Sequence, residues 1–288
     1  MARSRRSQQR KRRGKSSGGI GSILAIIGAL CVLIALVGAG AYLAINTERE
    51  VVLNDDLCPK SGARGTVAIL LDTTDELADV TKTEVKSRIL HIQNSLERFY
   101  RVSVYTLSED GLNAKPLASM CNPGRLDQMD DLAQQGLTAN PAMIERKYQE
   151  FEKVITTTVD SVFAKEFDAA QSPLLSSLQE LYGILPTPVT IDGELYPAGR
   201  NEIVFVSDLL EHTDVFSIYR TGIDFGAYDA SRAKEKYGRS YNSIDLKFWT
   251  VGRNREAFST LELMNFWSKV FVKDFNNSPK FHRLPGEI

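Results

Sequence analysis

The stretch "GTVAILLDTTDEL", residues 65–77, passes abruptly from apolar to polar side chains. Its apolar run from Val67 to Leu71 is short and ends sharply, which predicts a buried β-strand. Asp72 ends this run, and two hydroxyls and two more carboxylates follow it directly. Ligands of open parallel sheets bind beyond the carboxyl ends of the strands. The polar group after this strand is therefore a candidate binding site.

The rest of the chain alternates between the two periodicities of strands and helices. Further strands are predicted at 101–107, 201–209 and 243–252, with a short edge strand within 115–124 and a hairpin at 189–197. Amphipathic helices are predicted at 76–100, 141–168, 172–185 and 255–275, and residues 225–242 are expected to form a solvated loop or helix. This order predicts an α/β fold with a mainly parallel central sheet, Rossmann-like, with helices on both faces.

The N-terminal part carries a basic tail and a long uncharged segment. Residues 1–15 hold eight basic side chains and no acidic one, so the remainder carries 27 basic against 36 acidic residues, a net charge of −9. The 26 residues from Ile20 to Ile45 contain no charge, and as a helix they would span the roughly 30 Å of a bilayer core. The positive-inside rule then predicts a cytoplasmic N-terminus. The chain is expected to divide into a cytoplasmic tail (1–19), a transmembrane helix (20–45), a linker (46–64) and an extracytoplasmic domain (65–288).

This organisation predicts a single-pass protein of a cell inner membrane, with its main domain on the periplasmic or extracytoplasmic side. The tail would contact anionic lipid headgroups, and no nucleic-acid partner is needed to explain it. "AGA" at 39–41 resembles a signal-peptide cleavage site, but the apolar run is longer than usual for a signal peptide. Small residues at Gly21, Ala25 and Ala29 would allow self-association of the helix, and chance spacing in a Gly/Ala-rich segment explains them as well.

Three cysteines are present. Cys31 lies in the predicted membrane span, whereas Cys58 and Cys121 are the two cysteines of the external part. An oxidising compartment makes these two a candidate disulfide, and the alternative is a pair of separate buried thiols.

Four oxygen-bearing side chains are expected to meet at the carboxyl edge of the sheet. Asp72 and Thr74 follow the first strand, Ser172 precedes a helix, and Asp208 follows a later strand. Two carboxylates and two hydroxyls form a hard oxygen site that suits Mg²⁺, Mn²⁺ or Ca²⁺. The alternative is that Asp72 and Ser172 are helix caps.

The motifs resemble those of the von Willebrand factor A family over residues 65–275. "DTTDE" places Asp72 and Thr74 at the first and third positions of the Asp-x-Ser-x-Ser loop of that family's metal-ion-dependent adhesion site. "QSPLLSSLQEL" places Ser172 where the family has a threonine, and "VFVSDLLEH" places Asp208 where it has its later aspartate. The resemblance implies a von Willebrand A-like fold and a divalent cation, held by these four residues, that binds a carboxylate of a partner protein.

The sequence departs from the family pattern at two points. Glu76 stands at the fifth loop position instead of serine, and no glycine follows Asp208. An extra carboxylate at Glu76 could occupy the open coordination position. These departures leave two readings, a cation-dependent adhesion module and a metal-free scaffold of an envelope complex.

An enzymatic function is not expected. The sequence contains no GxSxG, HExxH, CxxC or P-loop motif. A HAD-type phosphohydrolase would use Asp72 as its nucleophile, but that reaction needs a second acid, and Thr74 occupies its position. The function expected from the sequence is therefore a membrane-anchored module that binds an unidentified protein partner.

Overall fold

The computed structural model describes residues 20–46, 52–128, 140–165, 167–186, 189–191, 194–196, 199–238, 244–252, 258–271 and 278–287. The basic tail and residues 47–51 of the predicted linker lie outside these ranges. The chain divides into two compact units, one of which contains helix α1 (Ile20–Asn46) and the other all of the remaining helices and strands. The two units are described separately.

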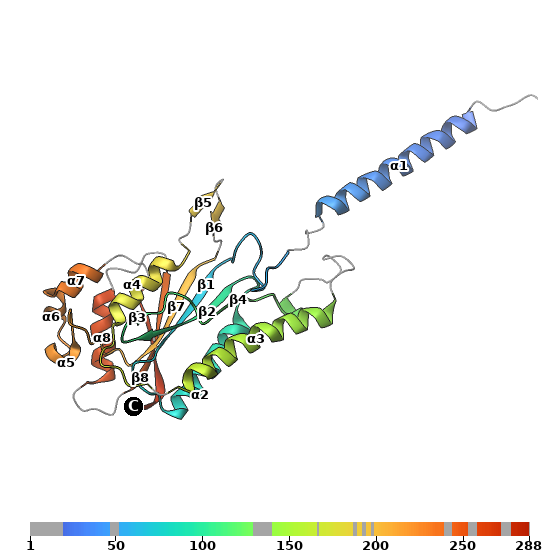
Figure 1. Ribbon diagram of the computed structural model, residues 1–288. Helices are drawn as coiled ribbons and strands as arrows, with labels where there is room; N and C mark the ends of the chain where they lie inside the picture. The colour runs from blue at the N-terminus through green and yellow to red at the C-terminus, as the bar shows by residue number, and fades with distance from the viewer. Residues whose placement is uncertain are drawn as a thin grey trace, which may run out of the picture. The chain divides into compact units, whose positions relative to one another are not determined.

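The second unit is an α/β domain built on a seven-stranded sheet (Figure 1). The strands are β1 (Thr66–Asp72), β2 (Arg101–Ser108), β3 (Gly111–Leu112), β4 (Ala118–Cys121), β7 (Asn201–Ser207), β8 (Ile244–Gly252) and β9 (Lys280–Glu287). Their order is β3-β2-β1-β7-β8-β9, and β4 also pairs with β2. All neighbours from β2 to β9 pair in parallel, and only β3 and β4 are antiparallel. The predicted fold class, α/β with a mostly parallel sheet, is confirmed.

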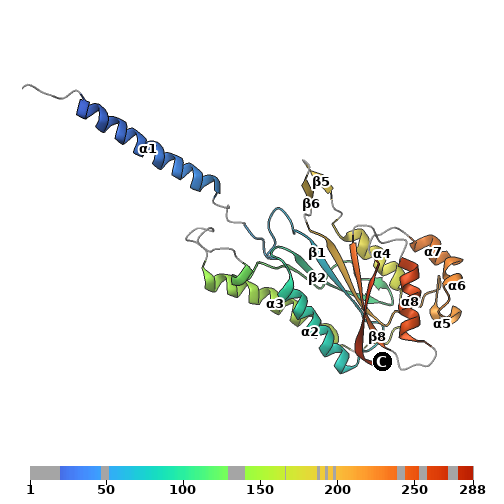
Figure 2. The same cartoon turned by 180° about the vertical axis from the view of Figure 1, so that it is seen from behind.

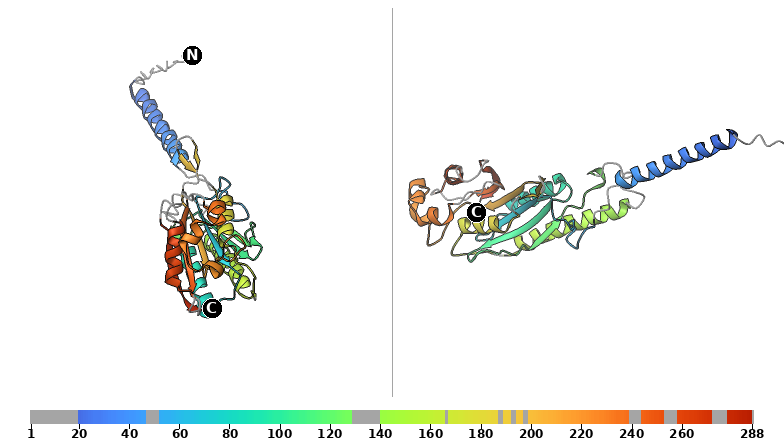
Figure 3. Two further views of the ribbon diagram at one scale, coloured as in Figure 1. Left: turned by 90° about the vertical axis from the view of Figure 1, so that its left-hand side faces the viewer. Right: turned by 90° about the horizontal axis from the view of Figure 1, so that it is seen from above.

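Helices cover both faces of this sheet, as Figures 1 and 2 show from opposite sides. One face packs against α2 (Asp79–Ser95) and α3 (Pro141–Phe163), and the other against α4 (Leu174–Ile184) and α8 (Thr260–Phe271). The α8 side also carries three short helices, α5 (Ile218–Thr221), α6 (Phe225–Asp229) and α7 (Arg232–Tyr237). Figure 3 shows the sheet between these layers from two further directions.

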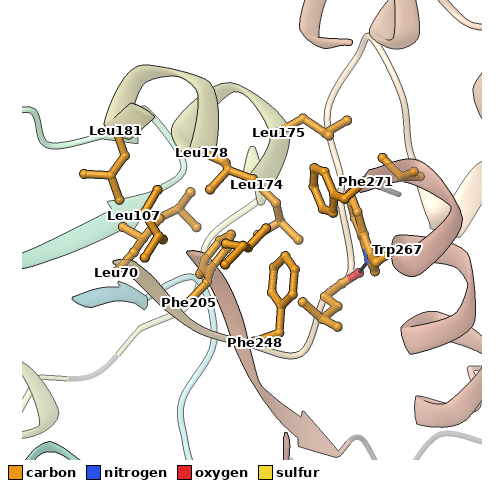
Figure 4. Packing of buried hydrophobic residues seen from close by; sticks show 14 of the residues in the cluster. Leu70, Leu107, Leu174, Leu175, Leu178, Leu181, Phe205, Phe248, Trp267 and Phe271 are labelled. Atoms are coloured by element: carbon orange, nitrogen blue, oxygen red, sulfur yellow. Dashed lines mark hydrogen bonds between the residues drawn. The ribbon is translucent and has the colours of Figure 1, made fainter. Parts of the chain in front are cut away.

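Burial on both faces explains the apolar run of the first strand. Ala68 and Leu70 pack into the core under α4 and α8, whereas Ile69 and Leu71 pack into the core under α2 and α3. A strand buried on one face only would alternate with polar residues, but a central parallel strand has no solvated face. Figure 4 shows the first of these cores, where leucines of α4 meet Phe205, Phe248 and the aromatic residues of α8.

Several element boundaries differ from the sequence-based expectations. The helix predicted at 76–100 is α2, and it ends at Ser95 because Leu96 has an extended backbone. Ser172 is not the N-cap of α4, contrary to the alternative role given to it above. Pro173, with ψ of 68°, takes this position, and its side chain makes no capping hydrogen bond. The edge strand is β4, and the hairpin is formed by β5 (Val189–Ile191) and β6 (Glu194–Tyr196), whose turn lies outside the described residues. The sequence did not indicate β3, β9 or the 3-10 turn η1 (Leu126–Gln128).

The predicted disulfide is confirmed. Cys58 and Cys121 are bonded, and both are buried. The bond joins the segment before β1 to β4 at one edge of the sheet. Backbone pairing between Leu53 and Pro59 also structures this segment, which belongs to the predicted linker.

Helix α1 is continuous over 27 residues. Its side chains are described for residues 26–42, and all of them are exposed and uncharged. Among the residues that the structure describes, no helix is both long enough and apolar enough to cross a bilayer.

Candidate functional site

The candidate site lies where the strand order of the sheet reverses. The chain moves from β1 to β2 on one side, whereas β7 lies on the other side of β1. The segments that follow β1 and β7 therefore leave the sheet in different directions, and such a switch point is where open α/β sheets bind ligands. Asp72 is the last residue of β1, and Asp208 directly follows β7.

Hydrogen bonds hold the carboxylate of Asp72 in one orientation. Its Oδ1 accepts bonds from the hydroxyl of Thr74 at 2.6 Å and from the backbone N–H of Thr74 at 3.1 Å. Its Oδ2 accepts a bond from the hydroxyl of Ser207 at 2.7 Å. Thr74 Oγ1 also lies 3.4 Å from Ser172 Oγ. The structure thus brings together three of the four predicted residues, Asp72, Thr74 and Ser172.

The fourth residue, Asp208, borders the same small cavity. This cavity has a volume of about 10 Å³ and is lined by Asp72, Thr74, Asp75, Leu77, Ser207 and Asp208. Asp208 Oδ1 accepts a hydrogen bond from Leu210 N at 3.0 Å, which orients its carboxylate. Ser172 contacts Thr74 but is not among the lining residues.

Two neighbouring buried carboxylates make the ionised form of the site energetically unfavourable. Asp72 is 9% exposed and Asp208 is 5% exposed. Burial, and next the charge of Asp208, raise the pKa of Asp72 to about 7. A divalent cation would favour the charged form of both groups, and carboxylate and hydroxyl oxygens are the ligands that hard cations prefer. The donor set therefore fits such a cation chemically.

The candidate site contains few carboxylate ligands. Among the residues that the structure describes, no group of three or more His, Cys, Asp or Glu side chains is arranged to hold a metal ion. A cation at this edge would depend on two carboxylates and on the hydroxyls of Thr74, Ser172 and Ser207.

Glu76 does not enter the cavity. Its side chain is 60% exposed, and its Oε1 lies 3.2 Å from Lys82 Nζ on α2. The adjacent Asp75 lines the cavity instead. The extra carboxylate of the loop is thus directed to an ion pair with Lys82.

The structure adds one buried acid that sequence reasoning missed. Glu211 is 1% exposed, and its Oε2 accepts a hydrogen bond from Leu175 N at 2.9 Å at the beginning of α4. Its Oε1 accepts a bond from the hydroxyl of Thr213 at 2.9 Å. Burial raises the pKa of Glu211 to about 7, and the charge of Asp72 contributes to this increase. Glu211 supplies the capping interaction that was expected from Ser172.

Ser207 is the second residue that was missed, although "SD" at the end of the strand is a visible signal. Its hydroxyl donates to Asp72 and accepts a bond from Leu209 N at 2.9 Å. Leu209 has a positive φ of 66°, an uncommon conformation for this residue type. The hydroxyl of Ser207 therefore connects the carboxylate of Asp72 with the backbone of the constrained turn after β7.

Replacement of Ser207 by alanine is expected to destabilise the domain by about 2 kcal/mol, because Leu209 N and one oxygen of Asp72 lose a buried partner. Urea denaturation followed by tryptophan fluorescence measures this change. Ser177→Ala is the matched control, since Ser177 is equally buried but its hydroxyl has no hydrogen-bond partner. Equal effects of the two substitutions would contradict the role given to Ser207.

Protein families and curated protein sequences offer no match to this chain. The interpretation of the site therefore rests on its own geometry and chemistry.

Proposed function

We propose that the α/β domain binds a divalent cation, Mg²⁺ or its substitutes Mn²⁺ and Ca²⁺, and uses it to bind a protein partner. The observation that carries this proposal is the meeting of Asp72, Thr74 and Asp208 around one small cavity at the switch point of the sheet, with Ser172 in contact with Thr74. These residues come from three separate parts of the chain. Their positions support the resemblance to von Willebrand A domains that the sequence motifs indicate.

The role is proposed to be binding, without catalysis. Both oxygens of Asp72 accept hydrogen bonds, and the side chain is almost fully buried. A nucleophilic carboxylate, as in a HAD-type phosphohydrolase, must reach its substrate. This environment favours a cation ligand or a structural group over a nucleophile.

The proposal includes a membrane anchor. The uncharged segment 20–45, the helical conformation of α1 and the exposure of its described side chains support this role. With the basic tail inside, the α/β domain would lie in the periplasm and help to assemble or regulate a complex at the inner membrane. The disulfide between Cys58 and Cys121 is consistent with an oxidising compartment.

A metal-free scaffold is the second candidate, and one observation favours it. The hydroxyls of Thr74 and Ser207 already satisfy the carboxylate of Asp72 by hydrogen bonds. A carboxyl group with a pKa of about 7 can also remain protonated, which removes the need for a cation. The two candidates differ in the expected consequence of losing Asp72.

Calorimetric titration of Mg²⁺, Mn²⁺ and Ca²⁺ into the full chain in detergent micelles tests the cation site. Asp72→Asn and Asp208→Asn are each expected to weaken binding at least about tenfold, because each removes a charged ligand. Glu76→Gln is the matched control, since this exposed acid of the same loop is paired with Lys82. It is expected to leave the affinity within about twofold of the wild type.

Circular dichroism establishes that each variant is folded. The absence of binding to folded wild-type protein would contradict the cation-dependent mechanism and favour the metal-free scaffold. Equal losses in Glu76→Gln and Asp72→Asn would show that general negative charge, and not this site, attracts the cation.

A further inference from the structure

A second cavity lies between α6 and α8, two helices that Figure 1 shows side by side. It has a volume of about 390 Å³, within the usual range of ligand sites. Its lining consists of Ile223, Phe225, Glu262, Asn265, Phe266 and Lys269. It shares no residue with the cavity at Asp72.

The apolar part of this cleft is held in place by aromatic packing. Phe266 is 3% exposed, stacks on Phe216 and meets the edge of Tyr228. Phe225 packs against the same Tyr228 ring from α6. Gly222, with φ of 73°, turns the chain directly before Ile223, which lines the cavity. These buried rings support Ile223 and Phe225, the partly exposed apolar residues of the cleft, and a surface held in this way needs little rearrangement to receive an apolar side chain.

The polar part of the cleft lies on one side of α8. Glu262, Asn265 and Lys269 recur at intervals of three and four residues, so they form a row beside Phe266. All three are exposed. Among the described residues, neither Glu262 nor Lys269 has an ion-pair partner. The cleft thus offers a carboxylate and an ammonium group seven residues apart on α8, an amide between them in the sequence, and the partly exposed apolar side chains of Ile223 and Phe225.

We propose that this cleft binds an extended peptide segment of a partner protein, in which a basic and an acidic side chain flank an apolar one. Glu262 and Lys269 are seven residues apart on α8, which places their Cα atoms about 10 Å from each other. In an extended chain, side chains at positions i, i+2 and i+4 share one face over about 13 Å, so the pattern basic–x–apolar–x–acidic matches the cleft.

The partner is therefore recognised by complementary charge at both ends and by contact of one apolar side chain with Ile223 and Phe225, the partly exposed apolar residues of the cleft. This site is independent of the cation at Asp72, and its test does not require one. The cleft would let the domain hold a partner segment while the carboxyl edge of the sheet is engaged elsewhere.

Fluorescence anisotropy with the full chain in detergent micelles and a chelator tests the proposal. The probe is the blocked peptide Lys-Ser-Leu-Ser-Glu, labelled with a neutral fluorophore. Saturable binding is expected, and replacement of the peptide leucine by alanine is expected to weaken it about tenfold. Absence of saturation up to about 1 mM peptide would overturn the proposal.

Charge-reversed variants give the sharper test, because they predict gains of binding. Glu262→Lys should prefer the peptide Glu-Ser-Leu-Ser-Glu, and Lys269→Glu should prefer Lys-Ser-Leu-Ser-Lys, each by about fivefold over the original peptide. The double variant should bind the original peptide again, in the opposite chain direction. Affinities that ignore these exchanges in folded protein would overturn the assignment of the two charges.

Discussion

Replacement of both Cys58 and Cys121 by alanine is expected to lower the free energy of unfolding of the α/β domain by about 4 kcal/mol. The bond closes a loop with a sequence separation of 63 residues. In the chain-entropy model, opening such a loop restores conformational freedom to the unfolded chain, and the cost to the folded state is about 4 kcal/mol. Because natural domains are stable by only about 5–15 kcal/mol, this is a large fraction of the total.

Urea denaturation of the full chain in micelles measures the change, with the buried Trp249 and Trp267 as fluorescent reporters. Cys31→Ala is the matched control, because Cys31 is exposed on α1 and forms no disulfide. It should leave the stability of the domain within about 0.5 kcal/mol of the wild type. If the double variant at Cys58 and Cys121 has the same urea midpoint of unfolding as the wild type, the stabilising role of the bond is contradicted.

Replacement of Glu211 by glutamine is expected to change the stability of the domain little at pH 4. At pH 8 the variant is expected to be more stable than the wild type by about 3 kcal/mol. Burial raises the pKa of this group from 4.5 to about 7 in the folded domain. Between these two pH values the unfolded chain has released its proton while the folded domain retains it. The unfolded state then binds fewer protons, so stability falls as pH rises through this window. Glutamine carries no charge and removes this loss.

The substitution preserves the local hydrogen bonds. The amide oxygen of glutamine can accept the bond from Leu175 N, and its NH₂ group can donate to Thr213 Oγ1, both of which now contact the carboxyl group. At pH 4 the protonated acid and the amide should therefore be nearly equal in stability. The pH dependence that remains in the variant, in the same direction, is assigned to Asp72, whose pKa is also raised to about 7.

Thermal denaturation between pH 4 and pH 8, with a chelator present, measures this effect. Glu180→Gln on the exposed side of α4 is the matched control and should change stability by no more than about 0.5 kcal/mol at either pH. A difference between Glu211→Gln and wild type that stays constant over the whole pH range would contradict the prediction.

The strands that are buried on both faces could be predicted well from the sequence. The strands β1, β2, β7 and β8 are buried on both faces, and their apolar runs reveal them directly. The sequence "KFHRLPGE" of β9 has no such run and contains proline and glycine, because β9 is an edge strand that pairs on one side only. The end of α2 was also misplaced, since the apolar spacing continues after the backbone has left the helical conformation at Leu96.

The candidate site was predictable where its contacts are local. Thr74 lies two positions after Asp72, and a hydroxyl or N–H at this distance commonly bonds to an aspartate side chain. Ser207 meets Asp72 across 135 positions, and Glu211 meets Leu175 across 36. The dipeptide "SD" marks Ser207 at the end of a strand, but the local pattern of residues does not indicate which distant residue Ser207 or Glu211 contacts.

The sequence by itself predicted the order of the main strands and helices, the parallel sheet and the strand end at Asp72. These features follow from periodicity, composition and spacing, which are properties of neighbouring residues. Only the tertiary structure decided that Ser207 orients Asp72, that Glu211 and not Ser172 caps α4, and that Glu76 faces Lys82. The physical reason is that hydrogen bonds and buried charges depend on distances in space, and folding sets these distances between residues far apart in the chain.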